Sequence, residues 1–138
     1  MTELKYDSLK VGDELPVMTT DPVSRHTLAL YCGASGDHNP IHVDLDYAKA
    51  AGLDDVIAHG VLSMGYLARM LNNWVPQQKI RSYRTRFTAM TNVGDTVTCT
   101  GRILEKLVVD GEKRVRLELY AETPQAQTLV AEAVVAVN

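Results

Sequence analysis

The sequence predicts an α+β fold in which a curved antiparallel sheet wraps around one central apolar helix. The helix is predicted over residues 60–71, where Arg69 is the only charged residue and apolar side chains occur on nearly every side. The sheet is predicted from runs rich in Val, Thr, Leu, Arg and Tyr at 79–90, 96–108, 113–122 and 128–137. We expect residues 1–138 to form a single domain.

The amino-terminal part is expected to contain a short strand at 14–19 and then a helix. Asp21 followed by Pro22 predicts an N-cap and a first helical position, and the helix is expected to run to about Cys32. Gly33 and Gly36 are expected to end it and to release the chain into a polar loop.

Two further helices are predicted after this loop. Asp44 is expected to cap a short helix that Gly52 ends. The central helix then begins at Gly60, is expected to be buried all round, and is ended by residues 72–76. A helix of this length is too short to span a bilayer.

The carboxy-terminal half predicts four strands arranged as an antiparallel meander, to which the amino-terminal strand adds. Asp110-Gly111 is a strong hairpin signal, because both central positions of a type I′ turn require positive φ. The last run has Glu132 as its only polar residue between 129 and 137. This pattern predicts a strand covered on both faces or paired at a subunit contact.

Bulk properties narrow the function classes. The net charge of −3 predicts no general attraction to nucleic acid. Cys32 and Cys99 stand apart without CxxC spacing, which argues against a zinc site or a disulfide scaffold and favours a reducing cytoplasm. The first residues lack the basic start and apolar core of a signal peptide, and we expect no membrane association.

The polar loop at 35–42 is the strongest functional signal. It places Asp37, His38, Asn39 and His42 in a segment that Gly and Pro stiffen, and such loops commonly display reacting groups. The sequence Ala-His-Gly at 58–60 then leads directly into the central helix. Together they predict an acid/base pair that faces a helix N-terminus.

These residues resemble the motif of the MaoC-like, (R)-specific enoyl-CoA hydratase family, which has the hot dog fold. The family's Gly-Asp-x-Asn-Pro-(Ile/Leu/Val)-His corresponds to residues 36–42, preceded by an aromatic residue at Tyr31 and followed by Ala48. The segment 57–60 is similar to the family's entry into its central helix. The resemblance covers nearly the whole chain.

The resemblance implies reversible syn hydration of a trans-2-enoyl thioester to the (R)-3-hydroxyacyl thioester, with Asp37 and His42 as the catalytic pair. Gly60 is expected to offer a backbone N–H and close approach to the thioester oxygen, because it begins a helix and lacks a Cβ. Asn39 is expected to hold the loop and to orient the pair. No cofactor is expected beyond the coenzyme A or acyl carrier protein that is part of the substrate.

Other polar residues in the sequence have plainer interpretations. His38 and His42 have the spacing of a zinc-binding pair, but Pro40 lies between them and Asn39 replaces the glutamate of HExxH, so we expect no metal. We expect His59 to be a satisfied structural histidine, and Ser63 to bond the preceding helical turn.

Basic residues cluster on the first predicted strand of the second half. Strand alternation predicts Lys79 and Arg81 on one face and Arg84 and Arg86 on the other. Arg84 and Arg86 are candidate contacts for the phosphates of coenzyme A, or for an acidic acyl carrier protein. A charged, solvated strand edge is an equally good interpretation.

Two alternative functions stay open from sequence. A hot dog thioesterase usually takes its carboxylate from the central helix, and residues 60–71 contain no Asp or Glu. A non-catalytic acyl-binding subunit of a hetero-oligomeric dehydratase would not need the intact Asp37 and His42 pair. The resemblance also implies a homodimer whose sheets join edge to edge.

Overall fold

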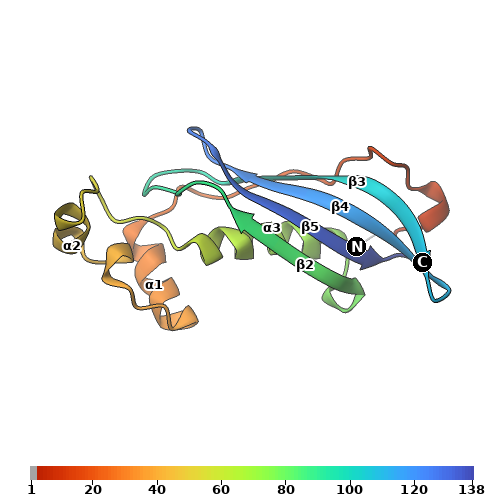
Figure 1. Ribbon diagram of the computed structural model, residues 1–138, viewed down its shortest axis with the longest axis horizontal. Coiled ribbons are helices and arrows are strands. Elements are labelled where there is room, and N and C mark those ends of the chain that lie inside the picture. Colours follow the sequence, from red (N-terminus) through yellow and green to blue (C-terminus); the bar gives the residue numbers. More distant parts are fainter. Residues whose placement is uncertain (1–2) are drawn as a thin grey trace.

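The computed structural model describes residues 3–138 as a five-stranded antiparallel sheet curved around one long helix (Figure 1). Two shorter helices, α1 and α2, project beyond one end of the sheet (Figure 1). The predicted α+β class, with a curved sheet around a central helix, is confirmed. The elements are β1 Met18–Thr19, α1 Arg25–Ser35, α2 Leu45–Ala50, α3 Gly60–Trp74, β2 Ile80–Phe87, β3 Thr98–Val109, β4 Glu112–Glu122 and β5 Gln127–Ala136.

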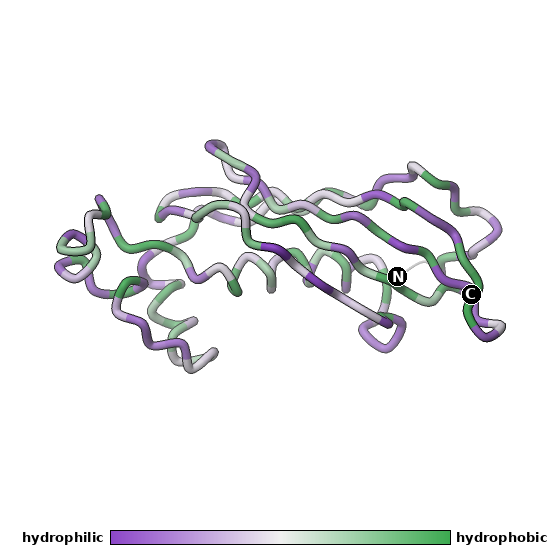
Figure 2. The backbone as a smooth tube through the Cα atoms, in the orientation of Figure 1, coloured by the Kyte–Doolittle hydropathy of each residue, from purple (hydrophilic) through white to green (hydrophobic). Residues whose placement is uncertain are grey.

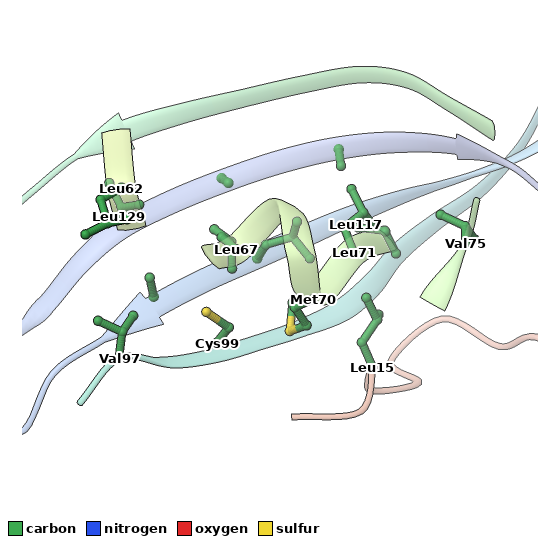
Figure 3. Packing of buried hydrophobic residues seen from close by; sticks show 14 of the residues in the cluster. Leu15, Leu62, Leu67, Met70, Leu71, Val75, Val97, Cys99, Leu117 and Leu129 are labelled. Carbon is green, nitrogen blue, oxygen red and sulfur yellow. The ribbon is translucent and has the colours of Figure 1, made fainter. Parts of the chain in front are cut away.

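The core lies between α3 and the concave face of the sheet (Figure 3). Leu67, Met70 and Leu71 of α3 are fully buried against side chains that point inward from the strands. Each such side chain stabilises the fold by about 1.5–3 kcal/mol through removal of apolar surface from water. The inward strand residues alternate along β3, β4 and β5, and include Cys99, Ile103, Val115, Leu117, Leu119, Leu129, Ala133 and Val135.

The central helix is longer than expected and is not buried all round. It runs from Gly60 to Trp74, and Val61, Gly65 and Arg69 on one side of it are exposed. The sheet covers only one face of α3, so the prediction of burial on every side is wrong. Val61, with 51% of its surface accessible, is an apolar side chain on the uncovered face of this helix.

The strand order is β1-β3-β4-β5-β2. The predicted meander is confirmed for β3, β4 and β5, and Asp110 and Gly111 have the positive φ values of 51° and 78° that a type I′ hairpin needs. The expected four-strand meander is wrong, because β2 pairs with β5 and lies at an edge of the sheet. Local turn signals could not reveal this, because residues 88–97 carry the chain from one side of the sheet to the other.

The outer face of the sheet carries alternating charges. Arg81 pairs with Glu112 at 2.8 Å, and Arg84 faces Glu132 at 3.6 Å. A register shift between Ile80 and Ser82 marks a bulge in β2, so strict alternation fails there and Arg81 joins the outer face. The predicted separation of Arg81 from Arg84 onto opposite faces is therefore wrong. Figure 2 shows that β2 is largely hydrophilic, as an exposed edge strand commonly is.

The first helix begins later than the Asp21-Pro22 signal predicts. The backbone of Val23 donates a hydrogen bond to Asp95 O (2.9 Å) and accepts one from Gly94 N (2.7 Å), and Ser24 after it is extended, so the helix starts only at Arg25. Ser24 is the N-cap, and its Oγ accepts a hydrogen bond from Thr27 N at 3.0 Å. This long-range pairing with the 94–95 turn overrides the local signal.

The helix ends are otherwise close to expectation. Gly36, with φ of 75°, is the C-cap of α1, whereas Gly33 lies inside that helix and does not end it. The Asp44 side chain caps α2 by accepting a hydrogen bond from Tyr47 N at 3.1 Å, as predicted. Gly52, with φ of 89°, follows the C-cap Ala51. Across residues 3–138, no helix has the length and apolar character that crossing a membrane requires.

The position of the N-cap predicts a difference between two substitutions. Ser24→Ala removes the capping oxygen and is expected to lower the free energy of unfolding by about 1 kcal/mol. Asp21→Ala, the matched control at the position that the sequence suggested, is expected to change it by less than about 0.5 kcal/mol. Urea unfolding of both variants checks this, and a larger loss for Asp21→Ala would contradict the assigned cap.

Candidate active site

The polar loop has a fixed shape because its own side chains satisfy its backbone. After the left-handed turn at Gly36, Asp37 N donates to Ser35 Oγ at 3.1 Å, and Asn39 N donates to Asp37 Oδ1 at 3.3 Å. Asn39 Oδ1 accepts from Ile41 N at 3.0 Å, which caps the short 3-10 turn Pro40–His42. The expectation that Asn39 holds the loop agrees with this contact, and its role towards substrate stays a prediction.

His42 is fixed by the segment that leads into α3. Its Nδ1 lies 2.7 Å from Ile57 O, and a carbonyl only accepts hydrogen bonds, so this partner assigns the proton of the neutral ring to Nδ1. Nε2 then carries the lone pair, and it lies 3.9 Å from Asp37 Oδ2. The structure thus brings the two predicted catalytic groups together, with one of them ready to accept a proton.

The separation of these two atoms suits one water molecule. At 3.9 Å they are too far apart for a direct hydrogen bond. A water oxygen about 2.8 Å from each would see them at an angle of about 90°, which is within the range that water accepts. The His42 side chain is 11% exposed and that of Asp37 is 47% exposed, so the carboxylate side of the pair is open to solvent.

A cavity of about 200 Å³ connects His42 to the start of α3. Gly60 is the first residue of α3, and its N-cap His59 makes no side-chain capping bond, so no side chain caps the first turn. A Cβ on Gly60 would lie 2.9 Å from Phe87 Cδ1, so a larger residue here would have to displace the Phe87 ring. The cavity is lined by His42, Ile57, Ala58, Gly60, Ser63, Phe87, Ala89, Met90, Thr91, Thr128 and Leu129.

Sequence reasoning missed the hydroxyl groups on the far wall of this cavity. Ser63 Oγ lies 3.5 Å from Thr91 Oγ1 rather than bonding the preceding helical turn, so that expectation is wrong. Thr91 and Thr128 are both buried and both line the cavity. Thr91 follows β2 and Thr128 lies at the start of β5. No local motif marks either residue, because only long-range pairing of the chain brings them to α3.

His59 is in contact with both members of the pair. Its ring stacks on that of His42, with centroids 3.8 Å apart and planes at 22°, and Nε2 lies 3.2 Å from Asp37 O. Burial lowers the pKa of His59, and the neighbouring His42 lowers it further, while the contact with Asp37 partly opposes this. The expectation of a satisfied structural histidine is wrong in one respect, because Nδ1 is buried and has no hydrogen-bond partner among residues 3–138.

The geometry is poorly suited to one metal ion held by Asp37, His42 and His59. One ligand atom of each lies within 4.8 Å of the others. An ion must lie near the plane of each imidazole that binds it, however, and two rings stacked at 3.8 Å with planes 22° apart do not converge on one point. The sequence-based expectation of no metal stays a prediction.

The basic pair Arg84 and Arg86 lies away from the cavity lining. Tyr83 OH donates to Met64 O of α3, so Tyr83 faces the helix and its neighbour Arg84 faces outward. There Arg84 and Arg86 line a shallow hollow together with Glu118 and Glu132. Contact of these arginines with a substrate phosphate or a carrier protein stays a prediction.

Comparison with known proteins identifies the family. The model described as "MaoC like domain" matches residues 8–123. The chain belongs to this MaoC-like family. A solved R-hydratase, PhaJ1 from Pseudomonas aeruginosa in the unliganded form, superposes with a TM-score of 0.85 at 28% identity, covering 99% of this chain and 87% of that one. The expected hot dog fold is confirmed by this match.

The curated relatives of this MaoC-like chain include proteins of very different length. It is 33% identical over 97 residues to the (R)-specific enoyl-CoA hydratase of Rhodospirillum rubrum, covering 69% of this chain and 66% of that protein. It is 29% identical over 117 residues to fatty acid synthase subunit beta of Saccharomyces cerevisiae, covering 83% of this chain but 6% of the subunit. The region similar to this chain therefore makes up about two thirds of the first relative and a small part of the second.

Proposed function

We propose that this protein catalyses the reversible syn hydration of trans-2-enoyl thioesters to (R)-3-hydroxyacyl thioesters. The observation that carries the proposal is the 3.9 Å separation of Asp37 Oδ2 from His42 Nε2, with His42 lining the same cavity as Gly60. Membership of the MaoC-like family and similarity to a named (R)-specific enoyl-CoA hydratase support the same reaction.

The geometry suggests a division of labour around one water molecule. His42 Nε2 takes a proton from the water as the water oxygen bonds to the β-carbon, while the Asp37 carboxylate accepts the other water hydrogen and orients the molecule. The electron pair of the double bond moves towards the thioester oxygen. The proton on His42 then passes to the α-carbon from the same face, which restores the neutral imidazole and completes the addition of one water.

Gly60 is proposed to stabilise the charge on the thioester oxygen. Its N–H belongs to the uncapped first turn of α3, where the helix dipole is positive. Donors of this kind in well-studied enzymes contribute about 3 to 4 kcal/mol to the stabilisation of the transition state. Asn39 would contribute indirectly, because it holds the turn between Asp37 and His42.

The first prediction concerns the catalytic pair. Purified protein mixed with crotonyl-CoA, or with longer enoyl-CoA chains, is expected to lose the absorbance of the conjugated enoyl thioester. Asp37→Asn and His42→Ala are each expected to lower kcat by roughly 100-fold or more, because each removes one of the groups that hold the water.

Circular dichroism and urea unfolding control for the fold of both variants. His38→Ala is the matched control, because His38 is exposed and contributes no atom to the group formed by Asp37, His42 and His59. An unchanged rate in Asp37→Asn, or a wild-type protein inactive on every chain length, would contradict the proposal. Release of free thiol instead of hydration would indicate a thioesterase.

A second prediction concerns the open corner at Gly60. Gly60→Ala is expected to lower kcat/KM by roughly tenfold or more, because the added methyl group would lie 2.9 Å from Phe87 Cδ1 and displace a ring that lines the cavity. Gly33→Ala is the matched control, since a Cβ there meets nothing within 4 Å. Steady-state kinetics on crotonyl-CoA check this, and equal rates for the two variants would refute the role of Gly60.

We also propose that the protein forms a homodimer through the free edge of β2. This edge strand has eight residues and a neighbour on one side only, and its backbone groups are open to pairing. The exposed face of α3, with Val61 and Gly65, offers apolar surface for the same contact. One relative, the fatty acid synthase subunit beta of Saccharomyces cerevisiae, is named as a subunit. Pairing with a different chain is therefore the alternative outcome.

Sedimentation at micromolar concentration tests the dimer. The wild type is expected at twice the mass of the 15.2 kDa chain. Val61→Glu is expected to shift the population towards the monomer, because it buries a charge at the contact. Val108→Glu is the matched control, since Val108 is equally exposed (59% against 51%) but lies on β3, away from the β2 edge. A wild type that sediments only at 15.2 kDa would exclude the homodimer.

A further inference from the structure

His59 occupies a position between the two proposed catalytic groups that its burial alone does not explain. It is 1% exposed and is the N-cap of α3, yet its side chain makes no capping bond. Instead, Nε2 lies 3.2 Å from Asp37 O and 3.4 Å from Cys32 Sγ, and the edge of Tyr31 packs at 4.7 Å between centroids. The ring is thus held from several sides, with one nitrogen directed at the loop that carries Asp37.

The partners of His59 assign its tautomer. Asp37 O accepts hydrogen bonds and cannot donate, so Nε2 carries the proton. Nδ1 then holds a lone pair, and this atom is buried without a partner. An unpaired buried acceptor costs free energy, so an apolar ring of similar size would serve packing better. Apolar packing alone therefore does not explain an imidazole at this position.

The stacked contact with His42 indicates a role for the His59 ring. The two rings lie 3.8 Å apart with planes at 22°, and they have complementary tautomers, with the proton on Nδ1 in His42 and on Nε2 in His59. Burial keeps His59 neutral by lowering its pKa. A neutral aromatic face favours the positive charge that His42 gains when it accepts a proton, whereas a second cation at this distance would oppose it.

We propose that His59 is a positioning residue of the active site: its Nε2–H fixes the backbone of Asp37, and its ring face fixes the imidazole of His42. Together with the Ile57 carbonyl that holds His42 Nδ1, His59 would then contribute to the 3.9 Å spacing between Asp37 Oδ2 and His42 Nε2. The inference deepens the proposed hydration reaction and rests on it for its kinetic consequence. The two tautomers and the ring stack that it predicts can be measured without an assay of catalytic activity.

Two substitutions separate the two contacts. His59→Gln keeps a donor near the place of Nε2 but removes the stacked ring. His59→Phe keeps a ring against His42 but removes the bond to Asp37 O. Both variants are expected to lower kcat for crotonyl-CoA by roughly 10- to 100-fold with KM changed by less than about threefold, because the substrate cavity is not lined by His59.

Cys32→Ala is the matched control. It removes the other neighbour of Nε2 but leaves the Asp37 carbonyl and the stack in place, so kcat is expected to stay within about twofold of wild type. If Cys32→Ala lowers kcat as much as His59→Gln, general packing explains the effect and the proposal is overturned. The proposal is also overturned if both His59 variants fold and keep the wild-type kcat.

Nuclear magnetic resonance of the wild type tests the geometry independently of catalysis and of the stability of the variants. Nitrogen-15 shifts are expected to show protonated Nε2 in His59 and protonated Nδ1 in His42 at neutral pH. The ring protons of His42 are expected to show an upfield ring-current shift that His59→Gln abolishes and His59→Phe retains. A charged His59 or the opposite tautomer would overturn the proposal. If the tautomers are as expected but the protein does not hydrate enoyl-CoA, the result counts against the proposed function instead.

Discussion

The site depends on the peptide groups around Ile57, which join three distant segments of the chain. Ile57 N donates to Ile41 O at 3.2 Å, and Ile57 O accepts from His42 Nδ1 at 2.7 Å. The next residue, Ala58, donates to Thr91 O at 2.9 Å. The polar loop, the entry to α3 and the segment after β2 are therefore held at one place. These bonds fix both the orientation and the tautomer of His42.

Local chemistry was enough to predict the parts of the fold that depend on neighbouring residues. The turn at Gly36, the Asp44 cap and the Asp110-Gly111 hairpin each follow from φ preference or a short side-chain bond. The start of α1 failed for the opposite reason, because Val23 bonds to the 94–95 turn. The placement of β2 beside β5 is non-local in the same way. The residue pattern of one strand does not determine which other strand it pairs with, so it cannot predict which strand lies at the edge of the sheet.

The same distinction between local and long-range contacts applies to the site. The composition of the Asp37 to His42 loop predicts an acid/base pair that faces the start of α3, and the resemblance assigns that pair to Asp37 and His42. The structure adds the neighbours that no motif marks, namely Thr91, Thr128 and the ring of Phe87 over Gly60. The meaning of His59 also needed coordinates. The sequence does not show the partners of a buried histidine, and here the 3.8 Å stack on His42 and the contact with Asp37 O distinguish it from an ordinary core residue.

The two groups of the proposed pair differ in how firmly they are held. His42 is buried, bonded through Nδ1 and packed against His59, whereas the Asp37 carboxylate is about half exposed and accepts one bond, from Asn39 N. A base that must take a proton at a defined point gains most from such fixing, since a displacement of 1 Å can cost about 100-fold in rate. A carboxylate that orients water tolerates more freedom. In the proposed reaction, the bond network around His42 therefore holds the group that needs the most precise geometry, and the solvent-facing Asp37 is held by the weaker contact.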